Sequence, residues 1–258
     1  MRNLAAQALL PVNTALAVAL LVLLLVAATT AAVVRLAPDG SRRRGREIVI
    51  AGVRATAQLA AVSLAIGWVV HHTPALFGFL LLMTAVAVRT AGRRITPNGT
   101  WVWAALPIAG PVVPVVTGLA LAGLVPVRGV AMIPVTGILI GGALTATVLA
   151  GRRSLDELRT RFGEFEAGIA LGLADREARL EIVRPAASDA LLPGLDQTRT
   201  VGLVTLPGAF VGMLLGGASP VLAGAVQLFV LIALMAVQSV AVAVTVELVA
   251  RGRLHRGA

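Results

Sequence analysis

The sequence contains no cysteine and no lysine, and each absence excludes a class of site. Without thiols the chain cannot form disulfides, thiolate metal centres or a cysteine nucleophile. All 22 basic residues are arginine. A phosphate-binding P-loop needs a lysine that reaches the phosphates, so the chain carries no standard ATP site. We therefore expect no cofactor and no metal to be bound by this chain itself.

Charged residues are also scarce, at 13% of 258 residues, whereas 58% are hydrophobic. Soluble domains carry roughly 25% charged residues. Several apolar runs exceed the ~18 residues that a helix needs to cross a lipid bilayer. The short alternating segments of a membrane β-barrel are absent from the sequence. The composition therefore predicts an all-α polytopic membrane protein.

Seven apolar segments predict about seven transmembrane helices. The first is interpreted as a retained span, because it is too long for a signal peptide and its arginines follow it. The predicted spans are Val12–Val34, Glu47–Val70, Pro74–Thr90, Trp101–Val125, Val130–Ala150, Val201–Gly217 and Val221–Ala250.

The arginines are concentrated in every second loop between these spans and in the carboxyl-terminal tail. Nineteen of them lie in residues 35–46, 89–98, 151–199 and the tail after Ala250, whereas Arg2 and Arg128 lie on the other side. Arginine-rich loops of membrane proteins stay in the cytoplasm. The pattern predicts an amino end outside and a cytoplasmic carboxyl end. It also accounts for the net charge of +10 without a nucleic-acid partner.

Polar side chains inside the spans are candidates for a translocation path. Arg54 and Gln58 share one face of the second span, and Gln227 and Gln238 lie in the seventh. An intramembrane charge is costly unless it faces protein or water. For each set an alternative to lining the path remains open. Arg54 could snorkel to the headgroups, and the glutamines could join helices by hydrogen bonds.

The region Ser154–Thr200 is the long polar stretch of the chain and holds nine of its twelve acidic residues. Ser154 is expected to cap an amphipathic helix, with Glu157 completing a capping box. This helix either extends the fifth span or lies along the membrane surface. Its apolar stripe follows steps of three and four residues through Leu155, Leu158, Phe162, Phe165 and Ile169.

A spaced motif follows in the same stretch: Glu166-Ala167-Gly168, three residues, Gly172, nine residues, Ile182, and then Arg184-Pro185. It resembles the EAA loop of ABC transporter permeases, which docks a short helix into a separate ATPase. Gly168 stands here for the second alanine of that loop, and Arg184 for a leucine. The matching residues, which the resemblance makes ATPase-coupling candidates, are Glu166, Ala167, Gly168, Gly172, Ile182 and Pro185.

The run from Ala190 to Gly208 resembles the signature of the FetB/YbbM family of ABC permeases, which is associated with iron export in bacteria and, in plants, with aluminium tolerance. Gly142 departs from the family pattern, because members carry asparagine at that point. The signature residues at the start of the sixth span are Asp196, Thr200, Gly202, Leu206, Pro207 and Gly208.

The resemblance implies one permease domain over residues 1–258, with a cytoplasmic coupling region at 151–200. It implies a non-enzymatic homodimer in the bacterial inner membrane, bound to two ATPase subunits that hold ATP and Mg. The expected function is ATP-driven export of iron or another metal. Alternatives are another cargo, such as a nucleotide sugar, and a non-transporting regulatory or assembly partner.

Overall fold

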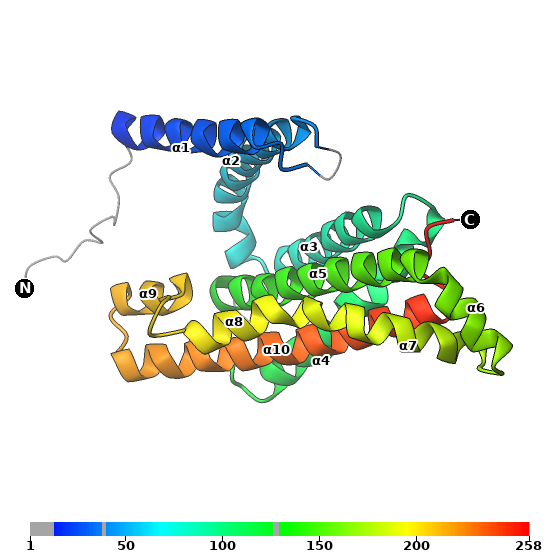
Figure 1. Ribbon diagram of the computed structural model, residues 1–258. Coiled ribbons are helices and arrows are strands. Elements are labelled where there is room, and N and C mark those ends of the chain that lie inside the picture. Colours follow the sequence, from blue (N-terminus) through cyan, green and yellow to red (C-terminus); the bar gives the residue numbers. More distant parts are fainter. Residues whose placement is uncertain (1–12, 38–39, 126–128, 258) are drawn as a thin grey trace, which may run out of the picture. The chain divides into compact units, whose positions relative to one another are not determined.

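The computed structural model describes residues 13–37, 40–125 and 129–257, and this part of the chain is helical apart from turns and one isolated bridge (Figure 1). Six of its helical segments are long and apolar enough to cross a membrane, which confirms the all-α polytopic class. The helices are α1 (Thr14–Val33), α2 (Arg43–His71), α3 (Thr73–Ile95), η1 (Gly99–Ala104), α4 (Ala105–Leu121), α5 (Gly129–Thr160), α6 (Phe162–Ala170), α7 (Asp175–Ser188), η2 (Asp189–Leu191), α8 (Leu192–Thr200), α9 (Gly208–Leu215) and α10 (Pro220–Ala250).

The chain forms two compact units, the first ending at Trp68 and the second beginning at Val69. In the first unit, small residues bring α1 and α2 together. A Cβ atom at Gly45 would lie 2.6 Å from the carbonyl oxygen of Ala28, and one at Gly52 would lie 2.8 Å from Leu24 Cδ1. The side chain of Asn13 caps α1 by accepting the N–H of Leu16 at 3.0 Å.

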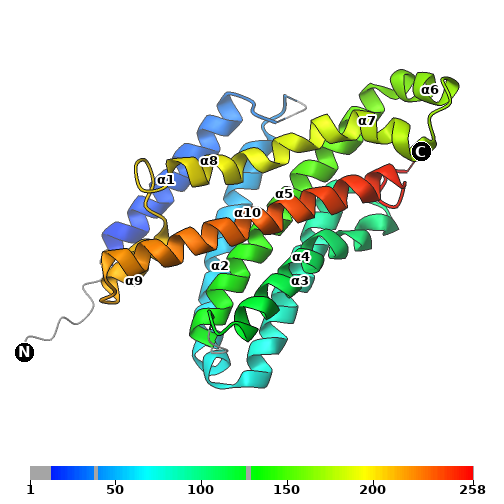
Figure 2. The ribbon, with the colours of Figure 1, turned by 90° about the horizontal axis from the view of Figure 1, so that it is seen from below.

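The second unit is built around α5 and α10, which α3, α4 and α7 surround (Figure 2). Small residues line the contact: Ala143 and Ala146 of α5 are fully buried, as is Ala241 of α10. Such residues let helix backbones approach closely. Gly142 belongs to the same contact, because a Cβ atom there would overlap the side chain of Leu234.

The carboxyl-terminal tail is fastened to the loop between α3 and η1. The hydroxyl of Thr96 and the amide of Asn98 each donate to the carbonyl oxygen of His255 at 2.8 Å. Arg256 donates to the carbonyl oxygen of Ile95 at 2.8 Å and pairs with Asp156 near the end of α5. The carboxyl ends of α5 and α10 therefore lie at the same end of the unit.

Because α5 and α10 end together, the chain between them must return along the bundle. The run of α7, η2 and α8 makes this return beside α10, and α9 lies near the start of α10 (Figures 1 and 2). Two contacts show that this segment runs antiparallel to α10. Arg176, near its start, pairs with Glu247 near the end of α10, and Gly194, farther along, contacts Gln238 nearer the middle of α10.

The predicted sixth span, Val201–Gly217, is not one continuous helix. Its helical part, α9, has eight residues, or about 12 Å, whereas the hydrocarbon core is ~30 Å thick. Gly202 has φ +84°, and the carbonyl of Thr200 accepts the N–H groups of Val204 and Thr205 at 2.9 and 3.2 Å. A tight turn therefore replaces the first part of the expected helix.

The predicted helix start at Ser154 is wrong. α5 runs on to Thr160, so Ser154 lies inside it and is fully buried, as one of the two readings of the amphipathic stripe expected. Leu155 and Leu158 pack against the core, and this burial stabilises the extended helix. The helix breaks at Arg161, and α6 carries the rest of the stripe. Val12, Arg2 and Arg128 lie outside the described residues.

Gly92 offers a test of the packing between α3 and η1. A Cβ atom at Gly92 would overlap the backbone carbonyl of Trp101, whereas one at Gly78 of the same helix would meet open space. We expect Gly92→Ala to lower the thermal unfolding temperature of the purified protein, because overpacking costs about 1–3 kcal/mol. Gly78→Ala should keep or raise it, since alanine favours helix. Equal unfolding temperatures would contradict the close contact.

Candidate functional site

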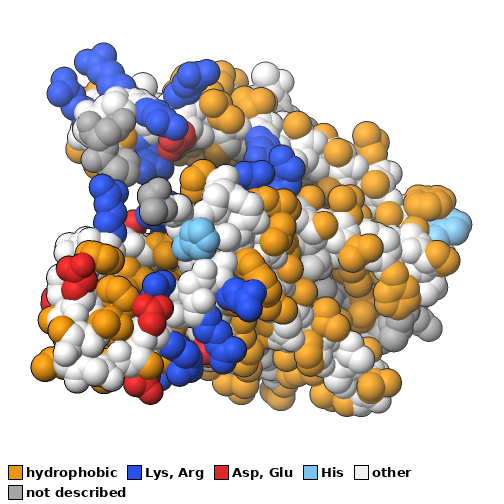
Figure 3. Space-filling model, turned by 90° about the vertical axis from the view of Figure 1, so that its right-hand side faces the viewer, with side chains coloured by type: hydrophobic (Ala, Val, Ile, Leu, Met, Phe, Trp, Pro, Cys, Tyr) orange, Lys and Arg blue, Asp and Glu red, His pale blue; other side chains and the backbone are white. Residues whose placement is uncertain are grey.

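The strongest candidate site is the helical tip, which we define as α6 and the turn after it, residues 162–174. No residue of α6 is buried, and Leu171 is 86% exposed. Phe162, Ile169 and Leu173 add further exposed apolar surface. In the part of Figure 3 that belongs to the second unit, acidic side chains and arginines lie at one end, and hydrophobic side chains cover most of the rest. Exposed apolar surface is typical of sites that contact another protein or the membrane.

Glycine at position 172 makes the turn of the tip possible. Its φ of +96° lies in the region that other residues rarely adopt. The turn closes through two hydrogen bonds: Gly172 N donates to the carbonyl of Ile169 at 2.9 Å, and Leu173 N to that of Gly168 at 3.1 Å. A Cβ atom at Gly168 would lie 3.2 Å from that of Ala178. Both motif glycines therefore set the close approach of α6 to α7.

Charged groups fix the orientation of α6. Arg161 pairs with Glu164 through two donors, with Nε lying 2.8 Å from Oε1. This hydrogen-bonded contact lowers the pKa of the Glu164 carboxyl and raises that of the Arg161 guanidinium. On the other side, Arg179 of α7 lies 5.2 Å above the ring of Phe165 and 3.2 Å from Asp175. The contact between Arg179 and Phe165 joins α6 to α7, whereas the Arg161–Glu164 pair lies at the start of α6 itself.

The tip is connected to the membrane bundle through α7. Arg176 donates to both carboxylate oxygens of Glu247 in α10, each at 2.7 Å. Planar bidentate pairs of this kind restrict orientation as well as distance. Glu247 also pairs with Arg251 in the last turn of the bundle. A movement of α7 would therefore act directly on the end of α10.

The six coupling residues predicted from the motif lie in two places, four of them in the helical tip and two in α7. Glu166 and Ala167 lie exposed on α6, and the two glycines shape the turn. Ile182 is buried in the core and cannot contact a partner. Pro185 lies exposed inside α7, which continues to Ser188.

The six signature residues form the junction between α8 and α9. Asp196 and Thr200 lie on α8, Gly202 makes the left-handed turn, and Pro207 caps α9, whose first residue is Gly208. Leu206 and Pro207 line a cavity of about 190 Å³ between this junction and α10. The signature thus encodes the break in the return segment of the chain.

The four candidate path residues are divided between the two units of the chain. Arg54 and Gln58 are exposed on α2 in the first unit. Gln227 and Gln238 are buried in α10 in the second, and Gln227 lines the cavity beside the α8–α9 junction. A Cβ atom at Gly194 would overlap the amide of Gln238, so α8 contacts α10 there. Among the described residues, no three or more His, Asp or Glu side chains form a metal-binding group.

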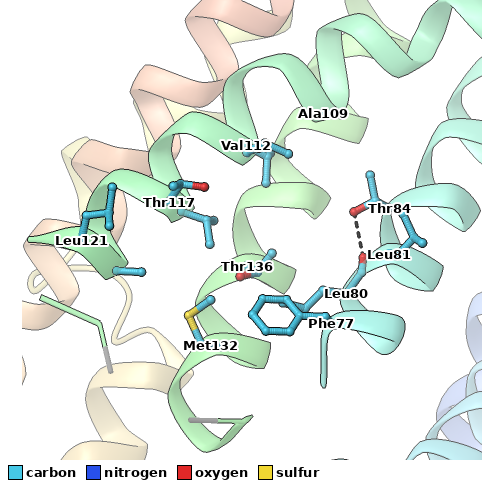
Figure 4. A pocket seen from close by; sticks show the side chains of 13 residues that line it. Phe77, Leu80, Leu81, Thr84, Ala109, Val112, Thr117, Leu121, Met132 and Thr136 are labelled. Carbon is cyan, nitrogen blue, oxygen red and sulfur yellow. Dashed lines mark hydrogen bonds between the residues drawn. The ribbon is translucent and has the colours of Figure 1, made fainter. Parts of the chain in front are cut away.

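A second cavity, of about 510 Å³, lies between α3, α4 and α5 (Figure 4). Phe77, Leu81 and Met132 represent its largely apolar lining, and the hydroxyl of Thr84 donates to its own helix at 2.8 Å. The oxygen of Thr136 has no protein partner. The lining of this cavity has no charged group.

Sequence reasoning missed two residues that connect the site, Arg176 and Glu247. The signal for Glu247 was available, because it is the single acidic residue of the seventh predicted span. A charge within an apolar span calls for a partner. The identity of that partner follows from the return of α7 along α10.

The comparisons with known proteins show which family the sequence belongs to. The chain matches the family described as "Uncharacterised protein family (UPF0014)" over residues 11–253. The "UPF0014 membrane protein STAR2" of Oryza sativa subsp. japonica is 33% identical over 198 residues, 75% of this chain and 69% of the relative. No solved structure matches the chain.

Two further relatives carry names that refer to transport or metals. "Protein ALUMINUM SENSITIVE 3" of Arabidopsis thaliana is 37% identical over 153 residues, 58% of this chain but little more than half of the relative, at 56%. The "Probable iron export permease protein FetB" of Escherichia coli K12 is 30% identical over 125 residues, 47% of each chain. By the match over residues 11–253 and the similarity to STAR2, the chain belongs to the UPF0014 family of membrane proteins.

Proposed function

We propose that this chain is the membrane-spanning permease subunit of an ABC transporter and that the helical tip docks into a separate ATPase subunit. The observation that carries the proposal is the exposed apolar tip, which two glycines shape and Arg176 connects to α10. The chain has no lysine for an ATP site of its own. ATP and Mg would therefore bind to the partner, and the chain itself would catalyse no reaction.

The proposed topology has seven crossings, with the amino end outside and the carboxyl end in the cytoplasm of a bacterial inner membrane. The arginine distribution supports it. α8, the turn and α9 would together make the sixth crossing, because discontinuous helices are tolerated where they are covered by protein or line water. Two permeases and two ATPases would form the assembly.

Iron or another metal is the proposed cargo, and export the proposed direction. Support comes from the E. coli relative, whose name refers to iron export. A nucleotide sugar is the alternative cargo. A regulatory or assembly partner that does not transport is the alternative function, and it would also require a docked tip.

Co-purification tests the docking. An ATPase subunit encoded beside the gene, expressed together with the permease, should elute with it in detergent at about equal molar amounts. Elution of the permease alone from membranes containing both proteins would contradict the proposal.

Gly172→Leu should uncouple the transporter. A leucine at φ +96° is strained by roughly 1–2 kcal/mol, so the turn and α6 would be displaced. We expect normal abundance but at least about tenfold slower ATP-driven iron transport into inverted vesicles, corresponding to about 1.4 kcal/mol. Gly118→Leu, which meets open space in α4, serves as the control.

Normal transport by the Gly172→Leu variant would refute the role of the tip. Transport of a nucleotide sugar instead of iron by the unaltered protein would overturn the cargo while leaving the docking intact. If ATP drives neither solute, although the ATPase binds, the regulatory alternative is favoured.

The contact between Arg176 and Glu247 should transmit the movement. A partly exposed ion pair stabilises a fold by about 0.2–1 kcal/mol, so Arg176→Gln should leave abundance nearly unchanged but slow transport severalfold. In a Glu247→Gln background the same change should have no further effect, because the contact is already lost. Additive losses in the double variant, measured by vesicle transport, would show that the residues act separately.

A further inference from the structure

We propose that α8 carries Asp196, Gln197 and Arg199 to the depth of the bilayer core, where they line a water-filled path for a hydrophilic cargo. The inference rests on the proposed transport function and assigns part of its path. It also revises the predicted topology of this segment, since the arginine pattern predicted that all of residues 151–199 lie in the cytoplasm.

The depth of α8 follows from its neighbours on α10. Gly194 contacts Gln238, which lies three residues from Met235, the midpoint of α10. The turn that follows α8 lines a cavity with Gln227 and Leu231, farther toward the start of α10. α8 thus lies beside the middle of a 31-residue span of about 46 Å. Its polar residues are therefore level with the hydrocarbon core.

The polar side chains of α8 do not point into the protein. The side chains of Asp196 and Arg199 are 69% and 68% exposed, and they lie 3.6 Å apart. Gln197 is exposed as well, whereas Gly194 is buried against α10. Charged groups at this depth face protein or water rather than lipid. Since the second unit does not cover this ion pair, the pair faces water or another protein surface, and the proposal assigns water.

A groove with a mixed, mainly apolar lining begins at the end where Glu247 and Arg184 lie. It has a volume of about 410 Å³ and runs between α7 and α10. Ser188 and Ser239 line its deeper part, and Leu191 closes it near the start of α8. The groove therefore runs from the end of the bundle that carries the helical tip as far as Leu191, one residue before α8.

The break after α8 suits such a path. Backbone that leaves the helical pattern at membrane depth is tolerated where it lines a water-filled cavity. Half-helices that end near the bilayer midplane recur at the substrate sites of transporters. α8 ends at Thr200 in this manner, and the exposed acid, amide and guanidinium suit a hydrophilic solute or ion rather than a lipid.

The absence of native cysteine allows a direct test. Single cysteines at positions 196, 197 and 199 would be treated in membrane vesicles with a hydrophilic, membrane-impermeant thiol reagent. The thiolate is the reactive form, and apolar surroundings suppress it. We expect each to react at least about tenfold faster than cysteines replacing Ile232 and Val240, which are exposed apolar residues of α10 in the same depth range. Labelling after denaturation would confirm equal amounts of protein.

Equal, slow labelling at all five positions would overturn the path. Protection of the α8 cysteines combined with disulfide formation between two copies would also overturn it, because α8 would then form a dry interface. Since labelling requires no ATPase, slow labelling in a permease that still co-purifies with its ATPase refutes the path alone. Fast labelling that slows when the ATPase and ATP are added would support it further.

Discussion

The close packing of α5 against α10 is the constraint on which the second unit depends. Alanines and Gly142 bring the two backbones together, so that neither helix can shift without losing contacts along its length. Lipid tails are as apolar as the helices, so van der Waals packing rather than water exclusion holds such a pair together. Because both helices end on the same side, the chain between them must return, and that return carries the helical tip, α7 and α8.

Polar contacts determine how the ends of this bundle are fixed. Glu247 receives Arg176 from α7 and Arg251 from its own helix. Arg256 fixes the tail to α3 and α5. Arginine suits these positions because its planar fork makes two bonds at once. The arginines mark the cytoplasmic side in the proposed topology and also join the helices at their ends.

Three parts of the polar stretch Ser154–Thr200 have different roles in the architecture that we propose. Its first residues complete α5, its middle forms the tip, and α8 returns beside the membrane core. A rigid α7, buried on one face against α5 and α10, connects the last two. Docking at the tip and opening beside α8 would then be coupled by one helix rather than by a flexible loop.

The sequence by itself determined the helical membrane class and most of the long helices, because apolar length acts locally. It could not determine that Ile182 is core, that Ser154 is internal, or that the sixth segment is broken around Gly202. Those outcomes depend on which face of a helix meets a neighbour distant in sequence. Only the tertiary structure placed Arg176 at Glu247 and α8 beside Gln238, since neither contact follows from residue spacing along the chain.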